Sequence, residues 1–319
     1  MKTTHLLTSA FTIGWLIATP TQADTFGSGA DAFTIDFVPI GNAGNGDNPS
    51  SGIGVYSSPY GGVAYDFRMG VTEVPEDWIN KATNLGMTGV TAGPWLGRQP
   101  ATNMTWFEAA AFVNWLNTST GHQAAYDLTR TGLAWAMNLW SSEQAWQAGG
   151  ENLYRNRDTF YFLPSEDEWY KAAHHRNDGV TANYWNYAFG SNSAPTAVAS
   201  GTGPGTAVFN QSFPAGPADV DNDGGLSPYG TQGQNGNAFE WNESASDGVN
   251  DSPFEDRTNR GGAWGNPEPY LRGSYRFSVT PSYATSVMGF RVASVPEPGT
   301  FGLLALSSLI LAARRRRER

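Results

Sequence analysis

The chain has 319 residues, a formal net charge of −10 and no cysteine. The absence of cysteine excludes disulfide bonds, thiolate metal sites and a cysteine nucleophile. The body of the chain has no basic stripe, which argues against a nucleic-acid partner because phosphate binding depends on clustered Lys and Arg. With 38 glycines and 12 tryptophans, the composition indicates an irregular fold whose core is filled by large aromatic side chains between glycine-permitted turns.

Residues 1–23 have the pattern of a secretory signal peptide. Lys2 precedes an apolar stretch at residues 10–18, and the small residues Thr21 and Ala23 come just before Asp24. We therefore predict cleavage after Ala23. Fold reasoning then applies to residues 24–294, which are enough for one large domain.

Two segments of this domain have helical patterns, and several others alternate. In "TWFEAAAFVNWLN", Thr105 and Glu108 form a capping box before apolar residues at helical spacing, and in "LPSEDEWYKAAHHR", Ser165 and Glu168 form another. Short alternating stretches predict strands at residues 32–40, 61–70 and 289–294. Two helices among short strands and long loops predict an α+β domain.

The second helix carries ionisable side chains at both ends. Glu166, Asp167 and Glu168 have the appearance of an acid/base cluster, but the helix dipole explains acids in a first turn without catalysis. His174 and His175 are adjacent and so point to different faces. We interpret them as complements to the helix C-terminus rather than as metal ligands.

The stretch "DVDNDGG" matches the start of a calcium loop of EF-hand type. Asp219, Asp221, Asp223 and Gly224 fit that pattern, but its final glutamate would fall on Gly230. A solvated acidic turn is the preferred interpretation, and calcium binding by the three aspartates is left open.

Five segments, in order, resemble the formylglycine-generating enzyme family, also called the sulfatase-modifying factor family. They are "YDFRMGVTEVPEDWIN", "PATNMTWFEAAAFVNWLN", "FYFLPSEDEWYKAA", "SPYGTQGQNGNAFEWNE" and "RGGAWG…LRGSYR…GFRVA". The similarity spans about residues 63–293. It implies a single compact domain of C-type-lectin-like topology, low in regular secondary structure and often stabilised by calcium.

The resemblance also implies a calcium site in "NGNAFEW". Carried over from the family motif, the ligands are the backbone carbonyls of Asn235, Gly236 and Ala238 and the carboxylate of Glu240, a mixture of hard oxygens that suits calcium. The alternative is that Glu240 caps backbone amides in a turn. A second family calcium site aligns only at Asn210, and weakly.

Four arginines recur near the C-terminal motifs. The resemblance implies that they are internal scaffold residues paired with carboxylates and carbonyls: Arg260, Arg272, Arg276 and Arg291. We therefore assign none of them to catalysis.

The residues that carry the family's chemistry are missing from this sequence. Members that oxidise a sulfatase cysteine hold copper with two cysteines after an "RGGSW"-type motif, whereas "RGGAWGNPEPYLRGSYR" has neither. Copper(I) prefers thiolates, which Asn266 cannot replace. Another branch holds non-haem iron with a histidine triad in an added helical domain. That domain is missing, and the mature chain keeps only His122, His174 and His175. We expect no copper and no catalytic residue.

The last 25 residues, 295–319, resemble the PEP-CTERM sorting signal of Gram-negative bacteria. Two prolines, Pro296 and Pro298, precede an uncharged run at residues 300–313 and the cluster Arg314 to Arg317, which favours the cytoplasmic side of a membrane. The resemblance implies a short transmembrane helix at about residues 300–313, transient anchoring in the inner membrane, and cleavage by an exosortase. Lys2 and this tail carry positive charge, so residues 24–298 have a net charge of −15.

The sequence therefore favours an exported surface or matrix protein that binds a glycan, an extracellular polysaccharide or a protein partner without catalysis. The alternative is an oxidoreductase of the formylglycine-generating type with a non-cysteine metal centre. A purely structural role in the cell envelope is a third possibility.

Overall fold

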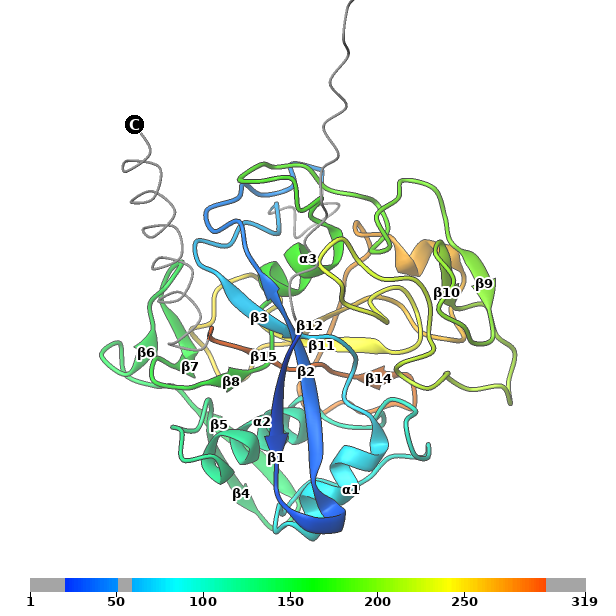
Figure 1. Cartoon of the computed structure of the whole chain (residues 1–319). Helices are drawn as coiled ribbons and strands as arrows, with labels where there is room; N and C mark the ends of the chain where they lie inside the picture. Colours follow the sequence, from blue (N-terminus) through cyan, green and yellow to red (C-terminus); the bar gives the residue numbers. More distant parts are fainter. Residues whose placement is uncertain (1–20, 51–58, 297–319) are drawn as a thin grey trace, which may run out of the picture.

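The computed structural model describes residues 21–50 and 59–296 (Figure 1). These residues contain three α-helices and fifteen short strands joined by long loops, which confirms a mixed α+β domain with few helices. No helix in the described ranges is long and apolar enough to cross a membrane. The tail helix predicted at residues 300–313 and most of the predicted signal peptide lie outside these ranges.

The main sheet has five antiparallel strands in the order β1-β2-β3-β15-β8. Their bounds are β1 Gln22–Phe26, β2 Phe33–Ile40, β3 Phe67–Gly70, β8 Tyr161–Phe162 and β15 Ala293–Ser294. β2 alternates buried and exposed side chains over most of its length, as the pattern at residues 32–40 predicts. Of the predicted strand at residues 61–70, only β3 is extended and paired.

Both ends of the described chain meet in this sheet. Arg68 of β3 forms a buried ion pair with Asp24 at 2.6 Å and donates from Nε to Ser294 Oγ at 2.8 Å. β15 lies between β3 and β8, so the last residues of the domain join strands that are far apart in the sequence. β1 begins at Gln22, two residues before the predicted mature N-terminus.

A second sheet has four strands in the order β13-β12-β11-β14, with only the β11–β14 pair parallel. Their bounds are β11 Phe239–Ala245, β12 Arg257–Arg260, β13 Phe277–Val279 and β14 Met288–Gly289. The predicted strand at residues 289–294 is therefore divided: Gly289 pairs in this sheet, and Ala293 and Ser294 pair in the main one.

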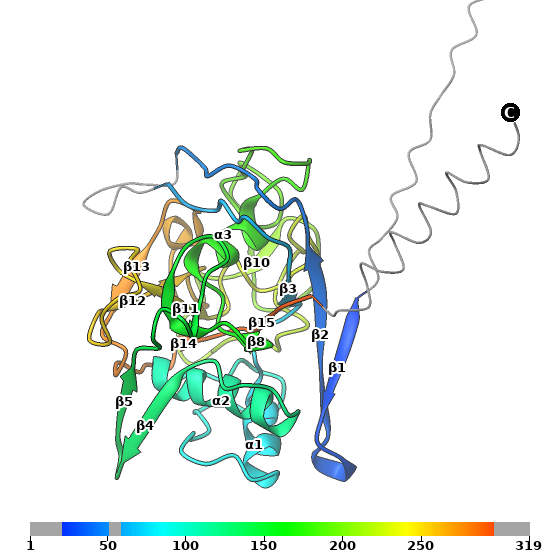
Figure 2. The ribbon, with the colours of Figure 1, turned by 90° about the vertical axis from the view of Figure 1, so that its left-hand side faces the viewer.

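The two predicted helices form with their capping boxes intact. α2 (Trp106–Ser119) begins after Thr105, whose amide donates to Glu108 Oε2 at 2.9 Å, and α3 (Glu166–His174) begins after Ser165, whose amide donates to Glu168 Oε2 at 2.6 Å. α2 passes beneath β8 in Figure 2 and buries apolar side chains on most of its circumference. A further helix, α1 (Glu76–Asn84), is not among the sequence predictions.

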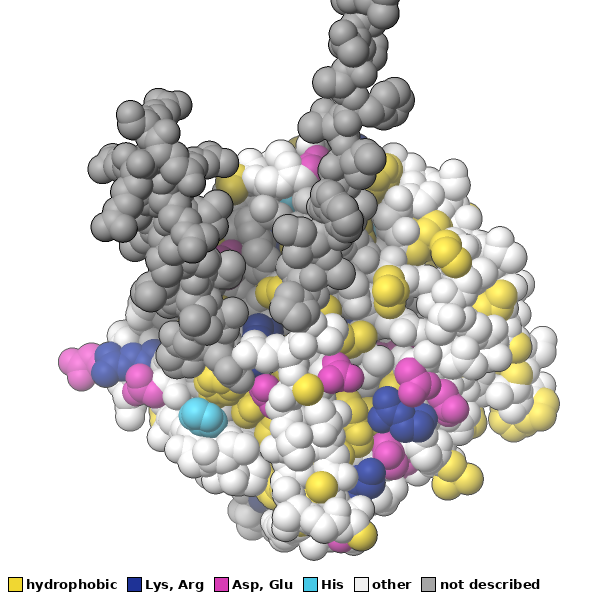
Figure 3. Space-filling view, in the orientation of Figure 1, with side chains coloured by type: hydrophobic (Ala, Val, Ile, Leu, Met, Phe, Trp, Pro, Cys, Tyr) yellow, Lys and Arg dark blue, Asp and Glu magenta, His cyan; other side chains and the backbone are white. Residues whose placement is uncertain are grey.

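Short hairpins and 3₁₀ turns complete the described chain. The elements are η1 Gly29–Asp31, β4 Asp127–Thr131, β5 Ala134–Asn138, β6 Ala145–Trp146, β7 Asn152–Asn156, β9 Thr196–Val198, β10 Thr206–Val208 and η2 Glu268–Leu271. The β6–β7 hairpin contributes to the site described below. On the face shown in Figure 3, charged side chains of both signs are scattered, with no continuous basic patch among the described residues.

Candidate functional site

The four residues predicted to bind calcium lie together at the start of β11, and the side chains of Glu240 and Asn235 are engaged with protein groups. Glu240 is fully buried, and its carboxylate accepts from Trp169 Nε1 at 2.7 Å and from Arg291 Nε and Nη2 at 2.5 and 2.6 Å. When the amide oxygen and nitrogen of Asn235 are assigned so that both find partners, the nitrogen donates to the Leu271 carbonyl and the oxygen accepts from the amides of Ala188 and Phe189.

Arg291 supplies the positive charge beside Glu240. Besides Glu240, its guanidinium donates to main-chain carbonyls at 2.7 to 3.2 Å: those of Gly70, Val71 and Gln232. A carboxylate and several carbonyls are the ligands that calcium would require. Here the Glu240 carboxylate is paired with a guanidinium and does not fit a metal in this arrangement. The carbonyls of Asn235, Gly236 and Ala238 are not among the acceptors of Arg291, so calcium binding by these carbonyls stays a prediction.

A pair of carboxylates lies beside the same loop. Glu73 accepts from the Ala238 amide at 2.9 Å, and the side-chain amide of Asn237 donates to both Glu73 and Asp223, at 2.6 and 3.2 Å. Burial raises the pKa of Asp223 to about 7. Asp219 and Asp221 are exposed, whereas Asp223 is buried, so the three aspartates of "DVDNDGG" do not converge on one site.

The carboxylates and histidines of α3 have separate roles. Glu166 pairs with Arg260 and Arg276 at 2.6 and 2.8 Å, which agrees with the scaffold interpretation of these arginines. His174 is buried, and desolvation together with the charge of Arg260 lowers its pKa to about 3. The low pKa of His174 disfavours the charged form that would complement the helix dipole.

The segment after "RGGAW" is closed by hydrogen bonds rather than arranged as a reactive centre. Asn266 Oδ1 accepts from the Ala263 amide at 2.9 Å. Arg272 pairs with Glu268 at 2.8 Å, and Tyr187 also donates to Glu268. Arg272 is half exposed, so the prediction that it is an internal scaffold residue is wrong.

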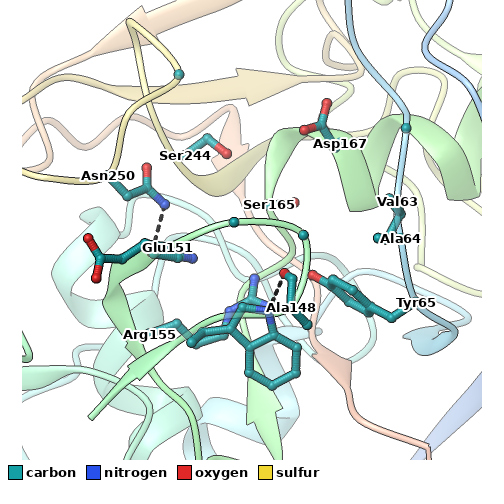
Figure 4. A pocket seen from close by; sticks show the side chains of 16 residues that line it. Val63, Ala64, Tyr65, Ala148, Glu151, Arg155, Ser165, Asp167, Ser244 and Asn250 are labelled. Atoms are coloured by element: carbon teal, nitrogen blue, oxygen red, sulfur yellow. Dashed lines mark hydrogen bonds between the residues drawn. The ribbon is translucent and has the colours of Figure 1, made fainter. Parts of the chain in front are cut away.

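The described residues also form an open pocket of about 270 Å³ that no sequence motif predicts (Figure 4). Four segments supply its walls: the loop before β3, the β6–β7 hairpin, the N-terminus of α3, and the end of β11 with the loop that follows it. The lining residues used below are Tyr65, Trp146, Glu151, Arg155, Ser165, Asp167, Ser244 and Asn250.

An aromatic pair forms one wall of this pocket. The rings of Tyr65 and Trp146 meet edge to face with centroids 5.4 Å apart, and both side chains are half-buried. Trp146 Nε1 donates to the Ala148 carbonyl at 2.9 Å, and the Tyr65 hydroxyl donates to Glu168 at 2.7 Å. The guanidinium of Arg155 also lies over the Trp146 ring, with Cζ 5.2 Å from the ring centroid. These contacts hold both rings in fixed positions next to polar groups.

Arg155 lies at the floor of the pocket, and two carboxylates share its guanidinium. It makes two bonds to Glu168, at 2.8 and 2.9 Å, and three to Glu243, at 2.7 to 3.1 Å. All three side chains are fully buried. Two carboxyl groups thus share one guanidinium, and burial raises the pKa of Glu243.

Asp167 lies at the rim, opposite Asn250 in Figure 4. Its Oδ1 accepts from the Gly61 amide at 2.9 Å, and no described residue donates to Oδ2. Desolvation, and then the charges of Glu166 and Asp47, raise the pKa of Asp167 to about 7. The helix dipole therefore does not account fully for Asp167, because this residue also lines the pocket and has a carboxylate oxygen without a described donor.

A second cavity of about 210 Å³ adjoins the first and shares Tyr65, Trp146 and Ala148 with it. Its other walls include Phe162, Val295 and Pro296. Unlike the first pocket, it is mainly apolar. It marks the place where the domain ends and the C-terminal tail begins.

Fold and site together define an α+β domain in which short strands and long loops surround a core of paired arginines and glutamates. The chain belongs to the family of the sulfatase-modifying factor enzyme 1-like domain, whose family model matches residues 67–295. The PEP-CTERM protein-sorting motif matches residues 294–317. Both resemblances seen in the sequence are thereby confirmed.

Solved structures support the same fold. Similar ones are Treponema denticola variable protein 1 (20% identity, TM-score 0.57, covering 86% of this chain and 99% of that one), CarF (20%, 0.55, 82% and 99%) and PvdO from Pseudomonas aeruginosa (18%, 0.53, 86% and 98%). At such identities the likeness shows the fold alone. No curated protein sequence matches the chain.

Proposed function

We propose that this protein is an exported, non-catalytic member of the family that binds an extracellular polymer through the pocket bounded by Tyr65, Trp146 and Asp167. The observation that carries the proposal is the pocket itself. Rigid aromatic faces lie beside acceptors and hydroxyls, the combination that recognises a ligand with apolar faces and polar edges.

The chemistry of the domain supports binding more than oxidation. The chain has no thiol to hold copper, and within the described ranges no three His, Asp or Glu side chains gather in a way that could hold a metal ion. In the segment after "RGGAW", Asn266 and Glu268 are engaged with neighbouring groups. Among the residues that the structure describes, no specific contact between side chains favours the alternative function as an oxidoreductase.

The sorting motif determines where this binding would occur. A PEP-CTERM motif implies an exported protein whose tail is recognised by an exosortase. Transient anchoring in the inner membrane, followed by release to the surface, is part of the proposal. A polymer outside the cell is then the ligand within reach.

The test is retention of the mature exported protein on polysaccharide and envelope protein from its own host. We expect retention on the polysaccharide well above that of a control protein of similar charge, and its loss in Trp146→Ala. Failure to retain the protein on either material would overturn the proposal. Conversion of a sulfatase-derived peptide to its aldehyde would overturn the non-catalytic part.

A further inference from the structure

The charge of the pocket restricts the ligands that it can take. Asp167 and the exposed Glu151 line it, and Arg155, which is the basic side chain among the described lining residues, is shared by two buried glutamates. The charge of this lining cation is therefore already matched by two carboxylates, which disfavours an anionic ligand. The body of the chain, with a net charge of −15, adds a long-range field of the same sign.

We propose that the pocket binds an amino-sugar unit with a free, protonated amine, as part of an extracellular polysaccharide. This inference rests on the proposed function and specifies its ligand. Three features support it: the size of the pocket, its ring faces and its acceptors.

Size and ring faces favour a single sugar ring. A cavity of about 270 Å³ lies below the usual range for drug-sized ligands, so it suits one ring better than an extended segment. Trp146 and Tyr65 offer faces on which the C–H surface of a sugar packs, while the hydroxyls at its edge remain hydrated. A lone lysine side chain would leave most of this aromatic wall uncovered.

The acceptors favour an amine over a neutral substituent. An ammonium group has three donors and no acceptor, and Asp167 Oδ2 is an acceptor without a described donor. Ser165 and Ser244 each accept a backbone amide through their hydroxyl oxygens and can turn the hydroxyl hydrogen towards sugar oxygens. Above about pH 7, where Asp167 is ionised, a charge-assisted bond to it would be stronger than any bond that an acetylated nitrogen could make there.

The experiment compares ligands that differ in one group. Calorimetry on the mature protein would use soluble oligomers of glucosamine, the same oligomers fully N-acetylated, and polylysine as the probe for a protein partner. Host polysaccharide would be tested in parallel. We expect the glucosamine oligomers to bind at least about tenfold more tightly than the acetylated ones, which is the usual worth of one charge-assisted hydrogen bond.

Variants assign this binding to the pocket. Asp167→Asn and Trp146→Ala should each weaken glucosamine binding by about tenfold or more. The matched controls are Asp219→Asn, an exposed aspartate, and Trp185→Ala, a half-buried tryptophan that also has an arginine against its ring, at 4.0 Å. Both controls should bind as the wild type does, and circular dichroism would verify that every variant is folded.

The outcomes separate this inference from the proposed function. Equal binding of the acetylated oligomers would overturn the requirement for an amine. If only polylysine bound, and Asp167→Asn weakened that binding, the proposal of a sugar ligand would be overturned and a basic protein partner would be indicated. Binding of host polysaccharide that neither pocket variant weakens would overturn this site and leave the proposed function standing. No binding to any polysaccharide would overturn both.

Discussion

The guanidinium of Arg291 lies against the carboxylate of Glu240, where a metal ion bound to that carboxylate would lie. Two of its nitrogens reach the two carboxylate oxygens at 2.5 and 2.6 Å, and both residues are fully buried. The one carboxylate that the family resemblance assigns to calcium therefore has its counter-charge supplied by the chain.

We accordingly expect the melting temperature to be the same with calcium as with a chelator. Arg291→Met should lower the free energy of unfolding by roughly 3–5 kcal/mol, because it leaves a buried carboxylate unpaired. Differential scanning fluorimetry and urea denaturation measure the two effects. A calcium-dependent rise of several degrees that disappears in Glu240→Gln would restore the calcium site.

Arg155 should be another residue whose loss unfolds the domain. Arg155→Met removes the only guanidinium between Glu168 and Glu243 and leaves two buried carboxylates facing each other. We expect a loss of roughly 3–5 kcal/mol in urea denaturation. Arg157→Met is the matched control: Arg157 is 59% exposed, and its removal should change stability by no more than about 0.5 kcal/mol. Similar values for the two variants would contradict the importance of the cluster.

Stability should depend on pH through Asp167. Because its folded pKa is raised to about 7, the folded state holds a proton that the unfolded state releases near pH 4, so stability falls as the pH rises from about 4 to about 7. Asp167→Asn removes this loss. Its stability relative to the wild type should therefore be greater at pH 8 than at pH 5.

Urea denaturation at the two pH values measures this difference. Asp219→Asn, at an exposed position, should show no such change. If Asp167→Asn gained stability at pH 5 rather than at pH 8, the sign of the shift would be wrong.

The sorting tail should be dispensable for folding, whereas β15 should not be. A chain that ends at Pro296 keeps every strand of the main sheet, so we expect its melting temperature to equal that of the full chain. A chain that ends at Val292 loses the pairing of Ala293 and Ser294 with both β3 and β8, and the bond from Arg68 to Ser294. At about 1 kcal/mol for each hydrogen bond lost, it should be less stable by roughly 3 kcal/mol or more. Thermal denaturation that did not distinguish the two truncations would refute this role of β15.

Local signals in the sequence were sufficient for part of the fold. The capping boxes at Thr105 and Ser165 are complete within four residues, so the starts of α2 and α3 follow from sequence alone. α1 also has local signals, with acids in its first turn and the buried residues Trp78, Ile79 and Ala82 at helical spacing, but its nine residues were interpreted only as part of a family motif. Division of residues 289–294 between two sheets depends on tertiary pairing, which no local pattern encodes.

The candidate site was less predictable for the same reason. Its walls come from four segments that are far apart in the sequence. The motifs that contain Tyr65, Ser165 and Asp167 indicate family membership and a helix start, and neither signal predicts a pocket. An aspartate is expected at a helix N-terminus. That Asp167 also lines the pocket is therefore apparent only when Gly61 and the β6–β7 hairpin are placed beside it. Glu240, in contrast, lies in a strong family motif. The calcium ion that this motif implies does not match the contacts of Glu240 with Arg291 and Trp169.

The position of β15 has a consequence for the order of events during synthesis. β3 and β8 have no direct pairing with each other and are joined only when Ala293 and Ser294 insert between them. These residues lie at the start of the sorting motif, so the ribosome must reach the motif before the main sheet can close. By the time the tail is presented to its processing enzyme, every part of the domain has therefore been synthesised.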